Sequence, residues 1–428
     1  MSSALRSESG RAPLRVRGHG VKLYNLRHPI LAAKKVKSSL STHAHMWTFA
    51  FYGRRRFRDD PRYDLQSVTD GFRVQSDDRT DDAEILERIC DAYVRAIQKQ
   101  GAESETYQAS RRWQDIRQRS LGPVLRALLT RDIPALGRMY RNFFRDACSA
   151  GILGAPGGLA KAYFSGDIKD VHRHFYLSHV LCRLDYWKSL TGERYTTRDL
   201  AGPRVGNPFG VIIDGTHISV GAEYSHYCSH RLREQLDQER STVAEIGGGF
   251  GRMAYYLLRD RPGTRYVDFD LPENIALVSY YLMKALPDRK FLCYGEKAIT
   301  RESIAEADVV MLPRFALTSV PAYSVDLTFT SYGMSELSND QLKHYVKEIS
   351  RMTKGKLLFM GNRAVSQMVS ECVRNQSTSF ALGESCESGW HSYKVSGAGT
   401  GRVASADDST IIENCYRMEN RPVCETVV

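Results

Sequence analysis

The sequence lacks the features that mark membrane-spanning, exported or disulfide-rich proteins. No apolar run approaches the ~18–20 residues that cross a bilayer, and the opening MSSALRSESG lacks the apolar block of a secretory signal. The nine cysteines include no CxxC pair, so zinc-site spacing is missing and a paired disulfide framework does not fit an odd count. We therefore expect a cytoplasmic protein with reduced thiols and no membrane span.

Acidic residues are scarce only at the N-terminal end. Residues 1–60 contain thirteen Lys or Arg against three Asp or Glu, which accounts for +10 of the net charge of +11. The basic runs KKVK (34–37) and RRRFR (54–58) indicate an arm that contacts nucleic acid or an anionic surface, or that is simply a solvated extension. The nearly neutral remainder disfavours a nucleic-acid-binding core. We treat residues 1–70 as a basic N-terminal extension.

The rest of the chain divides into two zones by its apolar pattern. Between residues 71 and 204, apolar residues recur at helical spacing, as at Leu86, Ile89 and Tyr93, which predicts a helical cap or dimerisation domain and permits a homodimer. From residue 205 to 428, short β-branched runs alternate with helical patterns. The first four of these runs that we predict as strands are 242–246, 264–270, 307–313 and 325–331. This alternation predicts an α/β, doubly wound, Rossmann-like sheet with its ligand at the carboxyl ends of the strands.

The stretch AEIGGGFG is the strongest motif. Glu245 ends a predicted strand, and Gly247, Gly248, Gly249 and Gly251 follow. The dinucleotide fingerprint does not match because the last glycine comes one place early, and a P-loop does not match because no Gly-Lys-Ser/Thr follows. Glycines let the backbone approach a ligand closely, and the acid favours a cationic group. S-adenosylmethionine offers an amino group and a sulfonium, so we predict it as the cofactor.

A second carboxylate follows at the expected distance. The next predicted strand ends in DFDLP, about twenty residues after the glycines, where an acid can accept both hydroxyls of a ribose. We choose Asp270 over Asp268 for this contact and expect Leu271 to border the cofactor. The alternative is that these are ordinary turn and cap residues.

The chain resembles the sugar O-methyltransferases found in bacterial gene clusters for glycosylated natural products and surface polysaccharides. The resemblance covers most of residues 170–365. It is carried by GNPFGVIIDGTHIS, EYSHYC, AEIGGGFGRMAYYLLRD with DLPENIALVSYYLMKALP, and VDLTFTSYGMSEL. It implies a class I S-adenosylmethionine-dependent methyltransferase domain that methylates a sugar hydroxyl of a glycoside or saccharide. One departure is that the family pattern has Asn near Ser331.

Methyl transfer to a hydroxyl profits from a general base near the acceptor. In the segment after the fourth strand, Glu336 is the leading candidate base and Tyr332 a contact to substrate or sulfonium. The alternative for Glu336 is a carboxylate that stabilises a helix start. Upstream, His226 is the second candidate base and Tyr224 a cofactor neighbour.

Other histidines are weaker candidates. His217 is a third possible base, although a single histidine is more often structural. His172, His174 and His179 suggest metal only superficially, because we expect them on one helix and see no carboxylate cluster beside them. We predict no metal.

Two other functions remain open from the sequence. The basic arm would suit a nucleic-acid methyltransferase, although TSYG after the fourth strand is not the Asn-Pro-Pro-Tyr type of motif used for amino groups. The chain would also suit a non-enzymatic scaffold that keeps a degenerate cofactor fold. We expect a small-molecule saccharide partner and no nucleic acid.

Overall fold

The computed structural model describes residues 44, 46–73, 82–153, 168–219, 221–375, 380–391 and 410–418. Most of the predicted basic arm, residues 1–43, lies outside these ranges.

The described chain before residue 201 is helical, as its periodicity predicts. Local capping explains where several helices begin: the Ser110 hydroxyl accepts the Trp113 N–H at 3.3 Å, and the Asp132 carboxylate accepts the Ala135 N–H at 3.0 Å. In chain order the elements are a helix at 46–56, α3 (Leu65–Arg73), α4 (Ala83–Gln100), η1 (Glu105–Tyr107), α5 (Arg111–Ile116), η2 (Arg117–Leu121), α6 (Gly122–Thr130), α7 (Ile133–Tyr140), η3 (Ala147–Ser149), α9 (Asp170–Leu190) and η4 (Thr197–Leu200).

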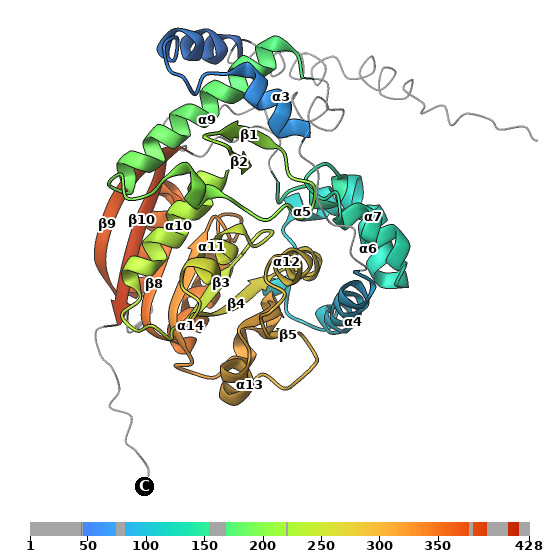
Figure 1. The fold of residues 1–428 in the computed structure, drawn as a ribbon. Helices are drawn as coiled ribbons and strands as arrows, with labels where there is room; N and C mark the ends of the chain where they lie inside the picture. The colour runs from blue at the N-terminus through green and yellow to red at the C-terminus, as the bar shows by residue number, and fades with distance from the viewer. Residues whose placement is uncertain are drawn as a thin grey trace, which may run out of the picture.

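The chain after residue 205 alternates strands and helices (Figure 1). It begins with the antiparallel hairpin of β1 (Gly210–Ile213) and β2 (Thr216–Ser219). The remaining elements are α10 (Ala222–Gln235), β3 (Thr242–Ile246), α11 (Arg252–Asp260), β4 (Arg265–Asp270), α12 (Pro272–Ala285), β5 (Phe291–Cys293), α13 (Arg301–Glu306), β6 (Val309–Pro313), η5 (Arg314–Ser319), β7 (Val325–Ser331), α14 (Asn339–Met352), β8 (Thr353–Asn362), α15 (Arg363–Asn375), β9 (Phe380–His391) and β10 (Thr410–Met418).

Within the described residues, β3 to β10 form one eight-stranded sheet in the order β5-β6-β4-β3-β7-β8-β10-β9. The strands from β5 to β8 pair in parallel, and β10 runs antiparallel to both of its neighbours. From β3 the chain goes first to β4 on one side, and later to β7 on the other. The order of winding therefore reverses at β3, and its carboxyl end borders the crevice where such sheets bind ligands.

Each face of the sheet has its own apolar core. Val243 and Phe329 pack with α10, α11, α12 and the helical part, whereas Ile246 and Phe359 pack with α13, α14 and α15. Alternate residues of a strand point to opposite faces, so this division follows from the strand register. The helical part and one face of the sheet thus share a continuous core.

The predicted fold class is confirmed. The strands expected at 242–246 and 325–331 have these bounds, and Pro272 begins α12 as its fixed φ favours at a first helical position. The domain limits at 70 and 204 stay predictions, and α3 crosses the first of them.

Candidate functional site

The glycine turn follows β3 and leads into α11. Gly247, Gly249 and Gly251 have φ values of +84°, +66° and +92°, the left-handed region that favours glycine. A Cβ on Gly247 would lie 2.6 Å from the Cα of Gly333. That close approach fixes the turn against the segment that follows β7.

Three carboxylates line the ends of β3 and β4 on one face of the sheet. Glu245 is the register partner of Asp268 across the parallel pair, and Asp270 lies two residues further along β4. The Tyr266 hydroxyl donates to Glu245 at 2.5 Å. The Gly248 N–H donates to Asp268 at 3.1 Å, so this acid holds the glycine turn in place. We call these three residues the acid row.

Burial and mutual repulsion keep part of the acid row protonated. Desolvation, with a further contribution from Asp270, raises the pKa of Glu245 to about 7. Desolvation and the charges of Glu245 and Asp270 raise the pKa of Asp268 well above its ordinary value. A cation bound beside Glu245 would favour its ionised form.

Asp270 is the member of the row nearest the end of its strand. Its Oδ1 accepts the Leu271 N–H at 2.7 Å and pairs with the buried Arg314 guanidinium at 3.0 Å. Among the described residues, these contacts fall on Oδ1, so Oδ2 is the oxygen available to a ribose hydroxyl.

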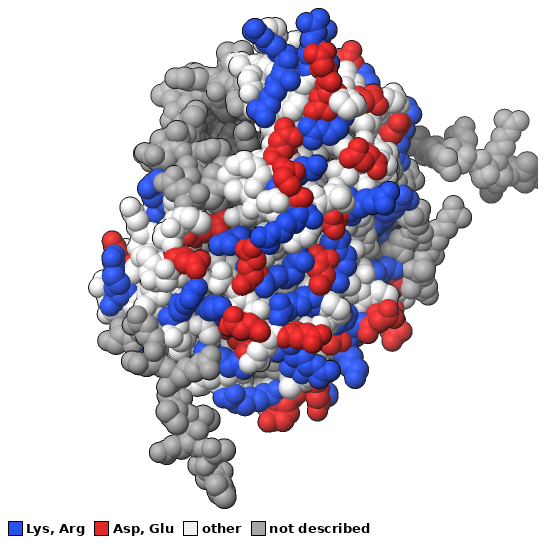
Figure 2. Space-filling model, turned by 60° about the vertical axis from the view of Figure 1, so that its left-hand side comes forward, with Lys and Arg blue, Asp and Glu red and all other residues white. Residues whose placement is uncertain are grey.

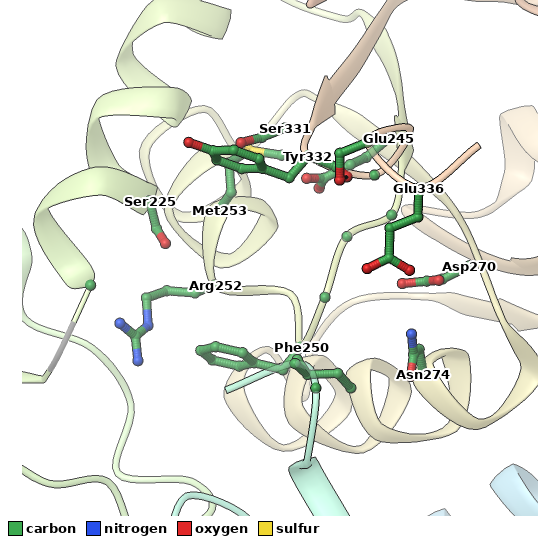
Figure 3. Close-up of a pocket in the computed structure, with 18 of the residues that line it drawn as sticks. Ser225, Glu245, Phe250, Arg252, Met253, Asp270, Asn274, Ser331, Tyr332 and Glu336 are labelled. Carbon is green, nitrogen blue, oxygen red and sulfur yellow. Dashed lines mark hydrogen bonds between the residues drawn. The ribbon is translucent and has the colours of Figure 1, made fainter. Parts of the chain in front are cut away.

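A cavity of about 590 Å³ opens above the glycine turn and the acid row. Figure 3 shows Asp270, Asn274 and Glu336 on one side of it and Ser225 and Arg252 on the other. The cavity therefore extends beyond the strand ends in two directions. We name the first side the nucleoside end and the second the acceptor end.

The nucleoside end is closed by the helical part of the chain. Glu336 accepts a hydrogen bond from the Ser110 hydroxyl at 2.7 Å and pairs with Arg112 at 2.6 Å. Asn274 borders the same end, and its buried Oδ1 has no hydrogen-bond partner within the described chain. This unsatisfied acceptor is an expected feature of a site that binds a polar ligand.

The acceptor end is formed by α9, the start of α10 and Arg252. Phe175, His179 and Arg183 of α9 line it, and Arg183 pairs with the buried Glu223 of α10. The Arg252 guanidinium lies 4.8 Å from the ring centre of Phe250. This end therefore combines aromatic surface with hydrogen-bonding groups.

The predicted cofactor residues are brought together. The cavity lining includes Glu245, Gly247, Gly248, Gly249, Asp270 and Tyr224. Leu271 and Gly251 are not part of the lining: the Leu271 N–H donates to Asp270, and Gly251 is the N-cap residue of α11. The Tyr224 hydroxyl bonds to Ser331 at 2.8 Å, which occupies the position where the family pattern has Asn.

The predicted catalytic residues are separated. Tyr332, with φ of +61°, and Glu336 line the cavity. His226 does not: it is fully buried between Trp187 and Tyr256, and its Nδ1 accepts the Trp187 N–H at 3.2 Å. Burial lowers the pKa of His226 to about 4. The prediction that brought His226 to the acceptor is not supported by this placement.

The third candidate, His217, is also structural. Its Nε2 lies 3.0 Å from the carbonyl of Gly71 in α3, and it is absent from the cavity lining. In its place the structure brings His179 to the cavity, a residue that the sequence reading considered only as a weak metal candidate. Arg314 and Asn274 were also missed, because neither belongs to a motif with a diagnostic spacing.

Two wider searches concern only the described residues. No group of three or more His, Cys, Asp or Glu with metal-site geometry occurs among them. None of the described helices has the length and apolar character that crossing a membrane requires.

Comparisons with known proteins give weak structural similarity. No protein-family model and no curated protein matches the chain. Among solved structures, LaPhzM matches at 15% identity over 46% of this chain and 55% of that one, with a TM-score of 0.30. The magnesium protoporphyrin IX methyltransferase of Synechocystis PCC 6803, solved with bound SAM, matches at 10% identity over 55% of this chain and 90% of that one, with a TM-score of 0.32. A SAM-dependent methyltransferase from Aquifex aeolicus matches at 12% identity over 54% of this chain and 98% of that one, with a TM-score of 0.30.

This chain spans about half of the length of LaPhzM. Because these TM-scores are low, the fold class is taken from the strand order of the chain itself. The described sheet is parallel and doubly wound from β5 to β8, and the antiparallel strand β10 is inserted before the last strand, β9. This strand order places the chain in the doubly wound, Rossmann-like α/β class.

Proposed function

We propose that this chain is an S-adenosylmethionine-dependent O-methyltransferase whose acceptor is a sugar hydroxyl of a glycosylated natural product or polysaccharide. The observation that carries the proposal is the junction of the acid row and the glycine turn in one cavity that continues to α9. The proposed cofactor site and the proposed acceptor site thereby share one cavity.

The residues at the nucleoside end and below the turn fit this cofactor. Asp270 offers Oδ2 to the ribose, and the Oδ1 of Asn274 offers an acceptor to an N–H or hydroxyl donor. Glu245 offers a buried carboxylate to a cationic group. Gly249 leaves the backbone approachable, since among the described residues a Cβ there would meet only Ile152 within 4 Å.

S-adenosylmethionine, when bound, supplies a methyl group on a positively charged sulfur. The chain's own residues must align the acceptor oxygen with that methyl and exclude water, and alignment alone is worth several kcal/mol. We assign the role of accepting the hydroxyl proton to His179, which lines the acceptor end; a general base contributes about 10²–10⁴-fold in typical enzymes. Glu336 remains the alternative base, although both of its oxygens already have partners.

A saccharide acceptor suits the acceptor end. Sugars present apolar C–H faces and hydroxyls together, and the aromatic ring of Phe175 lies beside the polar groups of His179, Arg183 and Ser225. On the face drawn in Figure 2, Lys or Arg and Asp or Glu interleave without an extended area of one sign. Such a surface gives little support to the nucleic-acid alternative.

The test is a transfer assay with methyl-labelled S-adenosylmethionine. Glycosides, nucleotide-linked sugars, oligosaccharides, RNA and DNA are offered side by side. Label on a saccharide supports the proposal, and label on nucleic acid alone overturns it. His179→Gln should retain cofactor binding while losing most of the transfer rate.

A further inference from the structure

The helix at 46–56 has one face fixed to the protein. Met46, Ala50 and Phe57 are buried, and Gly53 packs so tightly on α9 that an added Cβ would overlap the side chain of Ser178. These positions recur at helical spacing, so the opposite face of the helix points outward. In Figure 1 this is the blue helix that precedes α3 and crosses α9.

The outward face carries large apolar side chains. Trp47, Phe51 and Tyr52 are 61%, 71% and 50% exposed. Within the described residues only five large hydrophobic side chains are at least 50% exposed, and three of them lie on this one helix. Scattered exposed apolar residues need no explanation, but a cluster on one helix face marks an interaction surface.

Arginines continue the same surface. Arg54, Arg55 and Arg58 are exposed, and none of them has an acidic partner among the described residues. Arg56 differs, because it pairs with Asp185 at 3.6 Å. The preceding residues 1–43 add nine Lys or Arg and a single Glu by sequence.

We propose that the outward face of residues 46–58 docks on an anionic bilayer surface. Aromatic side chains insert at the boundary between headgroups and acyl chains, and arginines beside them bind the headgroup phosphates. A convex helix face suits a bilayer better than single-stranded nucleic acid, which binds in a groove. We call this surface the aromatic-basic face.

The helix that carries the aromatic-basic face packs through its opposite side against the acceptor end of the cavity. The inward Phe49 of the same helix has its ring centre 5.8 Å from that of Phe175 and 6.1 Å from that of His179, and both of these line the cavity. Docking would therefore hold the acceptor end close to the bilayer. This consequence rests on the proposed function: the acceptor that a bilayer would bring to this end is a saccharide carried on a lipid.

The test is vesicle co-sedimentation of the full chain, without cofactor or acceptor. We expect binding to vesicles of phosphatidylcholine with about one-third phosphatidylserine, and weak binding to phosphatidylcholine alone. Replacing Arg54, Arg55 and Arg58 by Gln should weaken the partition coefficient by about fivefold for each arginine. Trp47→Ser with Phe51→Ser should weaken it at least tenfold.

The control is Leu129→Ser, which changes a side chain that is equally open but lies on α6, and which should bind as the wild type does. Because the substituted side chains are exposed, the variants should stay folded, and a thermal melt of each variant verifies this. Absent vesicle binding, or wild-type binding by the Trp47/Phe51 variant, overturns the proposal. So does a result in which that variant instead loses self-association or RNA binding. Because no methyl transfer is measured, failure here leaves the proposed function untouched.

Discussion

Glu245 shows at the scale of one residue how the site selects charge. Its pKa of about 7 means that the carboxyl is protonated in acid and ionised in base. Because a sulfonium stabilises only the ionised form, S-adenosylmethionine affinity should rise about tenfold from about pH 6 to about pH 8. S-adenosylhomocysteine, with a neutral sulfur, should show a smaller rise. Calorimetry of both ligands across this range measures the difference.

The control is Glu245→Gln, which should flatten the pH dependence for both ligands. In the free protein the raised pKa of Glu245 also makes the free energy of unfolding depend on pH, and this free energy falls as the pH rises. Because the folded pKa lies above the ordinary value of 4.5, the folded state binds more protons. The contribution of Glu245 to the free energy of unfolding is thus complete at low pH and is lost as the pH rises toward about 7. A pH-independent ligand affinity in the wild type would contradict this role.

Two glycines of the turn should separate stability from binding. Gly247→Ala places a Cβ against the backbone of Gly333 and adds left-handed strain, so it should cost more than about 2 kcal/mol of unfolding free energy. Gly249→Ala has the strain without the clash and should cost about 1 kcal/mol, while its methyl group weakens cofactor binding.

Urea unfolding and calorimetry measure the two effects for the glycine variants. Gly122→Ala, at a helical position with open space around its Cα, is the matched control and should be neutral or stabilising. Equal stability losses for Gly247→Ala and Gly249→Ala would show that the close approach to Gly333 is unimportant.

Part of the site could be predicted at this scale, and part could not. Glu245 and the glycines after it have a spacing that local chemistry dictates. Asp270 could be predicted because it ends the next strand. Arg314 reaches the cavity because β6, which it follows, lies beside β4. Asn274 lies in the first turn of α12, directly after β4, where no diagnostic spacing marks it. His226 was misplaced because helical periodicity does not reveal which face of α10 meets the cavity and which meets Trp187.

At the scale of elements, Glu336 connects α5 to the segment after β7. Glu336→Gln removes the charge that Arg112 pairs with, so it should raise the KM for S-adenosylmethionine several-fold and leave kcat within about twofold. Since the Arg112 side chain is 67% exposed, the stability change should stay below about 1 kcal/mol. Steady-state kinetics of Glu336→Gln and Arg112→Gln should give matching profiles.

The opposite kinetic pattern would identify Glu336 as the base. In that case Glu336→Gln loses kcat by about 10²-fold or more and alters the pH–rate profile, whereas Arg112→Gln does not. The position of Glu336 at the nucleoside end favours the positioning role, because the acceptor end lies on the other side of the glycine turn.

The elements themselves were largely predictable. β7 is a mostly buried, β-branched run that ends at a turn, so its bounds follow from composition. β5 is only three residues long, and β9 has the polar, glycine-containing sequence FALGESCESGWH, so neither carries a strand pattern. Both occur at the edges of the sheet, where burial constrains sequence least.

At the scale of the whole molecule, the helical part completes the site and does more than cover it. Ser110, Phe175 and His179 come from helices that precede the α/β part by many residues, yet they line the same cavity as Glu245. The sequence suggested a cap domain but contained no rule for which of its side chains enter the site. The shared core explains why the two parts act together.

The most direct test of the account is calorimetric titration of S-adenosylmethionine into the wild type and Asp270→Asn. Asn preserves a side-chain acceptor for Arg314 and Leu271, so a thermal melt should show that the variant is folded. We predict a clear binding isotherm for the wild type and an affinity about ten- to a hundredfold weaker for the variant, because a charged hydrogen bond to the ribose is lost. No binding by the wild type, or equal affinity in the two proteins, would contradict the assignment of this site.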